Sequence, residues 1–267
     1  NQRHPKNTVL GVFLILYVVW LDYSYTIYDA LKYNLNMFNL QPVEPVDYLV
    51  IGHLARDITT NGFRLGGTAA YSALTAKALG MRTGIMTAWA GELPAEQLPG
   101  ITVVSLSTKN STTFENVYTD EGRIQYLHHQ ATHIDFESIP ENWKKSSIIH
   151  IGPIAQEVNP ILGEAFSPAM VGLTPQGWLR RWDEKGRVSA CQWTGAEVAL
   201  KAAGAAVISI EDVSGDEDEI ERMALACPVL AVTEGPAGAR LYWHNDLRKF
   251  RAPLKKEVDA TGAGDIF

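Results

Sequence analysis

The stretch that decides the fold starts with Asp47-Tyr48-Leu49-Val50-Ile51-Gly52, a short apolar run that has the composition of a buried strand and ends in glycine. Residues 69–79 follow with small and apolar side chains at helical spacing, between Gly66-Gly67 and Gly80. Residues 83–88 then predict a second buried strand. A strand, a helix and a strand in this order predict a β–α–β unit, from which parallel sheets are built.

The same alternation continues through the rest of the chain. It predicts strands over 148–152, 171–174, 205–210 and 229–233, and helices over 197–203 and 216–226. We therefore predict an α/β fold with a doubly wound, mostly parallel sheet flanked by helices. The 267 residues suffice for one large α/β domain or two small ones, and the hydrophobic fraction of 46% is ordinary for a globular protein.

Two stretches depart from this alternation. Residues 112–118 and 123–127 flank Asp120-Glu121-Gly122, a turn signal that predicts a β-hairpin. Residues 55–65, around Asn61-Gly62, predict a second hairpin. From the residues alone, each hairpin either projects from the sheet and has a function or is a surface hairpin without one.

The strongest chemical signal is Asp259-Ala260-Thr261-Gly262-Ala263-Gly264-Asp265-Ile266-Phe267. Two glycines flanking an alanine can turn sharply and open a helix whose first N–H groups are bare, and such amides bind anions. Asp265 would lie beside that anion. A carboxylate repels a phosphate, but there it can take a proton from a hydroxyl that attacks the phosphate. A loop before a helix with an acidic first turn is the alternative interpretation.

This terminal run resembles the C-terminal signature of the ribokinase-like, or pfkB-type, carbohydrate kinases, and residues 65–80 resemble the family's N-terminal signature. The resemblance extends from about residue 46 to residue 267. It implies a ribokinase-like fold whose hairpins form a small β lid. It also implies ATP-dependent phosphoryl transfer to a primary hydroxyl of a sugar or sugar-like alcohol. A nucleoside kinase of the same family and a non-catalytic sugar-binding relative are the alternatives.

The resemblance also implies roles for particular residues. Asp265 would be the catalytic base, and the amides of Gly262-Ala263-Gly264 would form an anion hole for the transferred phosphoryl group. Asp57, which we place just past the first strand at the sheet's carboxyl edge, would accept hydrogen bonds from the substrate's hydroxyls. Gly66 and Gly67 would let the backbone approach the substrate closely.

The chain departs from the family pattern at two points. Tyr71 stands where the family usually has an asparagine, which removes an amide partner for a hydroxyl-rich ligand. Ser209 and Asp212 stand at the ends of a segment where the family often has Asn-x-x-Glu. Asp212 is therefore expected to act on Mg²⁺ through water, or else to belong to an exposed acidic loop. Thr233 and Gly235 resemble the family's Thr-x-Gly turn near the nucleotide phosphates and are expected to bind the cofactor ATP.

Charge and cysteine content narrow the partners and the compartment. The net charge is -7 and no basic stripe is present, which argues against nucleic acid as a partner. Two arginines within 176–181 are candidate partners for a phosphate, although exposed arginines are usually solvated. Cys191 and Cys227 lack metal or redox spacing, so we expect free thiols in the cytoplasm. The expected partner is a small-molecule sugar or polyol, with homodimerisation through the lid as in some members of the family.

The two ends of the chain carry separate expectations. Residues 1–41 are predicted to be an N-terminal extension outside the fold, and dispensable for it. Their apolar run, 9–21, is shorter than the roughly 20 residues of a spanning helix, so membrane association is disfavoured but left open. Residues 42–267 are predicted to be a kinase domain that lacks its last helices, including part of the adenine pocket. We therefore expect the chain as it stands to be inactive.

Overall fold

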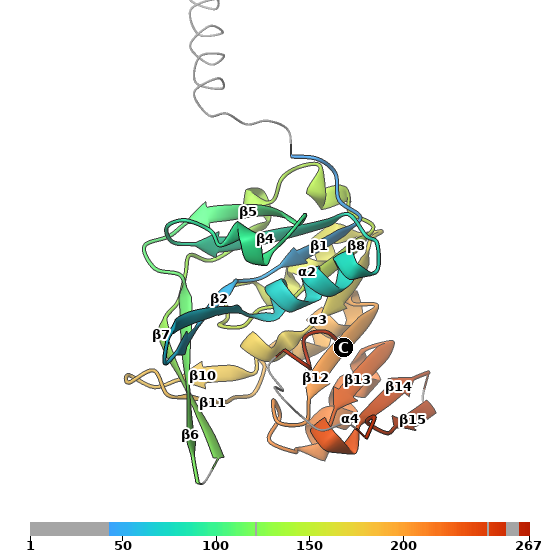
Figure 1. Ribbon diagram of the computed structural model, residues 1–267. Helices are drawn as coiled ribbons and strands as arrows, with labels where there is room; N and C mark the ends of the chain where they lie inside the picture. Colours follow the sequence, from blue (N-terminus) through green and yellow to red (C-terminus); the bar gives the residue numbers. More distant parts are fainter. Residues whose placement is uncertain (1–42, 121, 245, 255–261) are drawn as a thin grey trace, which may run out of the picture. The chain divides into compact units, whose positions relative to one another are not determined.

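A mixed sheet forms the centre of the computed structural model, which describes residues 43–120, 122–244, 246–254 and 262–267 (Figure 1). Within these residues the sheet has nine strands, in the order β15-β14-β13-β12-β9-β8-β1-β4-β5. Seven of them, from β13 to β5, run parallel, whereas β14 and β15 add an antiparallel edge. The predicted extension over 1–41, with its apolar run, lies outside the described residues.

Six of the nine strands, β1, β4, β8, β9, β12 and β13, agree closely with the predicted strands. The nine strands are β1 (Tyr48–Ile51), β4 (Thr83–Trp89), β5 (Thr102–Ser107), β8 (Ile148–Ile151), β9 (Met170–Leu173), β12 (Ala205–Ser209), β13 (Val229–Thr233), β14 (Ala239–Trp243) and β15 (Asp246–Phe250). The parallel strands are short and mostly buried, which is why their sequences are near-continuous apolar runs. The predicted α/β class is confirmed. The sequence did not predict β5, β14 or β15.

Three α-helices lie within the described residues: α2 (Thr68–Ala78), α3 (Ala196–Ala202) and α4 (Glu217–Ala226). In Figure 1, α2 lies along β1 and β4, and its buried Ala69 and Ala73 pack into the same core cluster as Val50 and Ile85. Short 3-10 helices occupy other connections: η1 (Ala95–Gln97), η2 (Phe136–Ser138), η3 (Trp143–Lys145), η4 (Pro160–Phe166), η5 (Pro175–Gly177) and η6 (Gly235–Ala237). No helix in the described part of the chain is long and apolar enough to span a membrane.

The order of the strands reverses between β1 and β8. From β1 the chain builds β4 and β5 on one side, and then β8, β9, β12 and β13 on the other. In parallel sheets, ligands bind outside the carboxyl ends of the strands at such a switch point. Gly52 and Gly152 stand at the ends of β1 and β8, and a Cβ on Gly52 would lie 2.3 Å from the carbonyl oxygen of Gly152. Glycine at position 52 therefore permits the two backbones to meet.

A buried carboxylate holds the chain together just beyond these glycines. Glu157 is fully buried and accepts hydrogen bonds from the backbone N–H groups of His53 (2.8 Å), Ile154 (3.0 Å) and Ala155 (2.7 Å). The His53 ring is also buried, and a hydrogen bond of 2.6 Å joins its Nδ1 to Oγ1 of Thr112. These contacts connect the switch point to the strands that project from it.

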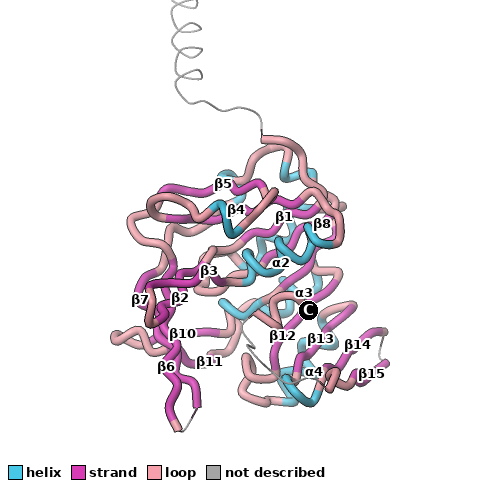
Figure 2. The backbone as a smooth tube through the Cα atoms, viewed as in Figure 1, coloured by secondary structure: helices cyan, strands magenta, loops and turns pink. Residues whose placement is uncertain are grey.

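The projecting strands form a separate four-stranded sheet, here called the lid. Its order is β3 (Gly62–Gly66), β2 (Ala55–Thr59), β6 (Thr112–Thr119) and β7 (Gly122–His129), as Figure 2 shows. Both predicted hairpins are therefore present. A further hairpin, β10 (Arg180–Trp182) and β11 (Val188–Ala190), was not predicted, and it adjoins β7 through a hydrogen bond of 2.8 Å from Leu127 N–H to the Gly186 carbonyl.

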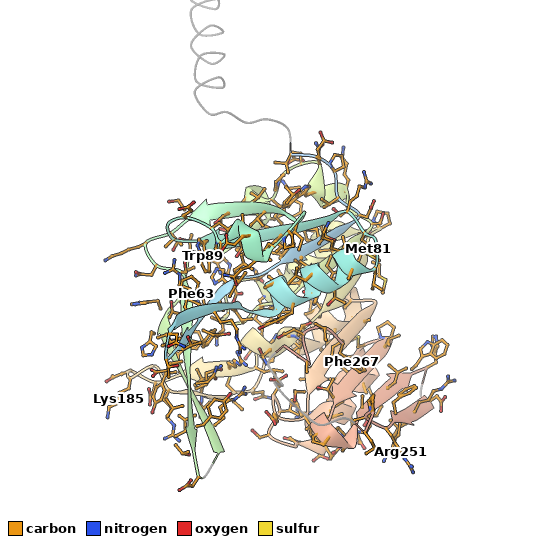
Figure 3. The ribbon with its side chains drawn as sticks, in the orientation of Figure 1. Phe63, Met81, Trp89, Lys185, Arg251 and Phe267 are labelled. Atoms are coloured by element: carbon orange, nitrogen blue, oxygen red, sulfur yellow. The ribbon has the colours of Figure 1, made fainter. Side chains whose placement is uncertain are left out.

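An arginine between two aromatic rings holds the lid against the central sheet. The Arg56 guanidinium lies 4.7 Å from the ring centroids of both Phe63 and Trp89, which are labelled side by side in Figure 3. Its Nη2 also donates to the Ala90 carbonyl at 3.1 Å. Cation–π contacts of this kind stabilise more strongly where they are shielded from water. They tie β2 and β3 to the end of β4.

Replacing Gly52 with alanine should destabilise the protein by about 1–3 kcal/mol or more, because the new Cβ meets backbone that cannot move away. Gly172→Ala is the matched control, since a Cβ at that position in β9 has nothing within 4 Å. The control should be neutral or slightly stabilising, because alanine loses less backbone freedom than glycine on folding. Urea unfolding of both variants measures the difference, and equal midpoints would contradict the close approach of the two strand ends.

Candidate active site

Asp57 follows β1 in sequence and lies within β2 of the lid, in the hairpin predicted over 55–65. Residues 55–59 pair with β3 and with β6, a strand distant in sequence. The Asp57 carboxylate packs against Gly66 at the end of β3, where a Cβ would lie 2.1 Å from Asp57 Oδ2. The absence of a side chain at Gly66 thus makes room for the Asp57 carboxylate.

Gly67 forms the start of helix α2. Its φ of +88° is unfavourable for other residues, and a Cβ there would lie 2.8 Å from the His53 carbonyl oxygen. Thr68, the first residue of α2, is fully buried. Its Oγ1 donates a hydrogen bond of 2.6 Å to Oδ1 of Asp265. The two signature segments, far apart in sequence, therefore meet at this hydrogen bond.

The segment Gly262–Phe267 begins with a tight turn. Gly262 has φ of +79°, and its carbonyl accepts hydrogen bonds from the N–H groups of Asp265 (3.1 Å) and Ile266 (3.2 Å). The N–H groups of Ala263 and Gly264 have no hydrogen-bond partner among the residues that the structure describes. Residues 259–261 of the terminal motif lie outside the described residues. The turn thus presents two bare amides next to the Asp265 carboxylate.

Tyr71, which stands where the resembling family usually has an asparagine, makes a packing contact of its own. A Cβ on Gly262 would lie 2.7 Å from Cδ1 and Cε1 of the Tyr71 ring, so the ring packs directly against this glycine. Any larger residue at position 262 would displace the ring or the turn. The sequence showed that position 71 lacks the asparagine amide, but it did not indicate this contact with Gly262.

Burial raises the pKa of both acidic groups of the site above the ordinary value. For Asp57 the effect of burial is partly offset by the guanidinium groups of Arg64 and Arg180. For Asp265 it is partly offset by the hydrogen bond from Thr68 and by the charge of Arg180. The negative charge of Asp265 also raises the pKa of Asp57. Carboxyl groups tuned toward neutral pH are typical of catalytic acids and bases.

Arg180 lies at the start of β10. The sequence indicated it only as one of two arginines that could pair with a phosphate. Its Nη1 donates to the Ile154 carbonyl at 3.4 Å, and its guanidinium lies 5.7 Å from the centroid of Phe114 in the lid. Burial lowers its pKa, which the charges of Asp212 and Asp265 partly restore. Arg180 is therefore a largely desolvated cation that faces the carboxylates of the site. Its burial depends on the unpredicted hairpin.

Asp212 lies in the turn after β12 and faces the same site. Its Oδ2 accepts from the Ser209 N–H at 2.9 Å, and its Oδ1 accepts from Gln176 Nε2 at 3.3 Å. Its charge raises the pKa of Asp265. Among the described residues, no group of three or more His, Cys, Asp or Glu side chains could hold a metal ion.

Thr233 and Gly235 follow β13, the strand beside β12. The Thr233 carbonyl accepts from the Ile210 N–H at 2.9 Å, which ties this turn to the one that carries Asp212. Gly235 has φ of +55° and begins the 3-10 helix η6. Between them, Glu234 forms an ion pair of 2.7 Å with Arg240. The turn is thus fixed at the carboxyl edge of the sheet, and no hydrogen bond joins it to Asp57 or Asp265 within the described ranges.

No protein-family model matches this sequence, and no curated protein matches it. Solved structures do. A pyrophosphate-dependent kinase in the ribokinase family, complexed with a pyrophosphate analog and myo-inositol, superposes with a TM-score of 0.68 at 18% identity, over 82% of this chain and 83% of that chain. Giardia lamblia ribokinase gives a TM-score of 0.62 at 14% identity, over 84% and 80%. Arabidopsis thaliana ribokinase, complexed with ribose and ATP, gives 0.60 at 14%, over 84% and 83%. The chain has the ribokinase-like fold that its motifs predicted.

The raised pKa of Asp57 predicts a pH-dependent cost to stability. A carboxyl whose pKa is raised by folding stabilises the native state when protonated, and this contribution is lost as pH rises through the folded pKa. Asp57→Asn should therefore raise the unfolding midpoint in urea at about pH 7, with the gain shrinking toward about pH 4. Asp120→Asn, at the exposed end of the β6–β7 hairpin, is the control. A gain for Asp57→Asn that is independent of pH would refute this explanation.

Proposed function

We propose that the chain carries the active site of an ATP-dependent kinase that phosphorylates a primary hydroxyl of a sugar or sugar-like alcohol. The observation that supports this most directly is the position of Asp265. Its carboxylate lies beside the bare amides of Ala263 and Gly264 and is held by Thr68 from the start of α2. A base next to an anion site suits phosphoryl transfer to a hydroxyl, because proton removal and charge stabilisation are needed at adjacent points.

In this mechanism, Asp265 takes the proton of the acceptor hydroxyl through Oδ2, since Oδ1 already accepts from Thr68. The hydroxyl oxygen then bonds to the terminal phosphorus of the donor, and the bond between that phosphorus and the leaving phosphate oxygen breaks. The amides of Gly262-Ala263-Gly264 stabilise the charge on the transferred group. Burial around Asp265 raises its pKa, which makes the carboxylate a better base near neutral pH.

The acceptor would be held on the lid side of the site. Asp57 accepts hydrogen bonds from acceptor hydroxyls, and Gly66 and Gly67 shape the backbone beside it. Arg180 neutralises the two carboxylates that flank the acceptor, as its effects on the pKa values of Asp57 and Asp265 indicate. A homodimer that pairs two lids is part of this proposal, and exposed Ile58, Val117 and Tyr118 lie on that sheet.

The donor would be held on the other side, at the carboxyl ends of β12 and β13. Thr233 and Gly235 bind the nucleotide phosphates, and Asp212 holds Mg²⁺ through water. When bound, Mg²⁺ would neutralise charge on the donor phosphates. The solved relatives described above include one complexed with ATP and one that depends on pyrophosphate. Both donors therefore belong in the test.

The deciding experiment incubates the full-length protein with Mg²⁺ and either ATP or pyrophosphate, against a panel of sugars, polyols and nucleosides. Release of product phosphate or ADP and mass spectrometry of the acceptor report turnover. Phosphorylation of a sugar or polyol from ATP supports the proposal. Turnover of nucleosides alone supports the alternative kinase, and saturable sugar binding without turnover supports a non-catalytic relative.

Asp265→Asn in the full-length protein should lower kcat by roughly 10²-fold or more, because it removes the general base. Acceptor affinity should stay within about twofold, since the asparagine oxygen can still accept from Thr68. Steady-state kinetics and calorimetric titration measure the two quantities. Asp135→Asn, at an exposed position remote from these contacts, serves as the control. Turnover within about threefold of wild type would remove Asp265 from the mechanism.

Asp57→Ala should act mainly on the acceptor. Acceptor affinity is expected to fall by about 1.5–3 kcal/mol, the contribution of a hydrogen bond to a charged group. Donor affinity should change little, because Asp57 lies in the lid. Separate titrations with donor and acceptor test this, and an equal loss of both, or of neither, would count against the assignment.

A further inference from the structure

We propose that Thr68 is a positioning residue for the base, and that its hydroxyl fixes the Asp265 carboxylate so that one oxygen is left to face the acceptor. The inference rests on the proposed function. It goes beyond that function in assigning a role to a side chain that carries no charge and takes no part in bond making.

The Thr68 side chain has one orientation available. It is fully buried at the first position of α2, and a Cβ on Gly152 would lie 2.7 Å from Thr68 Cγ2. The methyl group is thus packed against the end of β8, which directs Oγ1 to the opposite side, toward Asp265. A β-branched residue has few χ1 rotamers, so packing of the methyl group also sets the hydroxyl.

The backbone of Thr68 is held equally firmly. The Thr68 carbonyl accepts from Ser72 Oγ at 2.5 Å, and Ser72 lies near the Tyr48 hydroxyl, whose pKa burial raises and Ser72 partly lowers. The Tyr48 hydroxyl in turn lies 2.5 Å from Nδ1 of His150, whose Nε2 lies 2.7 Å from Thr174 Oγ1. Burial lowers the pKa of His150 to about 4, so this chain of hydrogen bonds adds no charge near neutral pH. Thr68 is therefore anchored through β1, β8 and the residue after β9.

The consequence for Asp265 is both geometric and electrostatic. With Oδ1 held at 2.6 Å by Thr68, rotation of the carboxylate is restrained and Oδ2 keeps a defined direction. The hydrogen bond also favours the ionised form, as does Arg180 from β10, whereas Asp212 from the turn after β12 opposes it. Among the described residues, Asp57 in the lid also interacts with Asp265, whose charge raises the Asp57 pKa. Removal of the Thr68 hydroxyl should therefore raise the pKa of Asp265 and loosen its orientation.

The test compares Thr68→Val, which keeps the shape but removes the hydroxyl, with Thr68→Ser, which keeps the hydroxyl. Thr75→Val is the matched control, because its hydroxyl on the same helix only bonds back to the Tyr71 carbonyl. Thr68→Val should lower kcat by roughly 10- to 100-fold, the effect of one hydrogen bond to a charged group. The acceptor KM should stay within about threefold, and the acid limb of the kcat profile should move to higher pH.

Thr68→Ser should restore most of the activity, and Thr75→Val should match the wild type. NMR titration of the Asp265 carboxyl in wild type and Thr68→Val should show a higher pKa in the variant, and this measurement needs no turnover. If the wild type phosphorylates no acceptor, the proposed function fails while the titration still decides the role of Thr68. If Thr68→Val does not fold, Gly152→Ala replaces it, because the added methyl displaces Thr68 with its hydroxyl intact. An unchanged kcat profile and an unchanged Asp265 titration would overturn the inference.

Discussion

The rest of the structure depends on the meeting of β1 and β8 at their carboxyl ends. Two backbones come together there because Gly52 has no side chain, and the buried carboxylate of Glu157 then satisfies the N–H groups that the sheet leaves unpaired. A buried charge without such donors would be strongly destabilising. The same point directs the chain outward into the lid and brings Gly152 against Thr68. Lid, helix α2 and sheet are thus positioned by one set of contacts, and the candidate site lies where they converge.

Opposed electrostatic effects meet in that site. Burial disfavours ionisation of Asp57 and Asp265, whereas Arg180 favours it. The folded chain accordingly holds acidic groups in a setting that costs stability near neutral pH, which is typical of functional sites and unusual for structural ones. Arg180 is itself largely removed from water and is kept in place by the lid and by the Ile154 carbonyl. The charges of Arg180, Asp57 and Asp265 therefore depend on one another, and replacing Arg180 should change the pKa values of Asp57 and Asp265.

Apolar periodicity and turn residues were sufficient to predict the elements that are determined by residues close together in the sequence. The apolar runs predicted the parallel strands other than β5, and Asn61-Gly62 and Asp120-Glu121-Gly122 predicted the lid hairpins. The strands β10 and β11 were not predicted, because three residues each are too few for a pattern. The hairpin that carries Asp57 was predicted, but its pairing with β6 was not, because that pairing is a long-range contact. For the same reason, the burial of Arg180 and the contacts of Thr68 and Tyr71 could not be read from the sequence. The motifs indicated the proposed base Asp265 and the glycines beside it, but not the residues that contact them.

Helix α2 touches the terminal turn at two points one helical turn apart, through the Thr68 hydroxyl on Asp265 and the Tyr71 ring on Gly262. Side chains at i and i+3 lie on the same face of a helix, so one face of α2 serves as the platform for the turn. This gives a physical account of Tyr71 in place of the amide that the resembling family usually has. An asparagine offers hydrogen bonds to a ligand, whereas a tyrosine ring offers packing area to the glycine that begins the turn. In the proposed kinase, this exchange would favour a fixed turn at Gly262 over an additional acceptor contact at position 71, and acceptor binding would then depend mainly on Asp57.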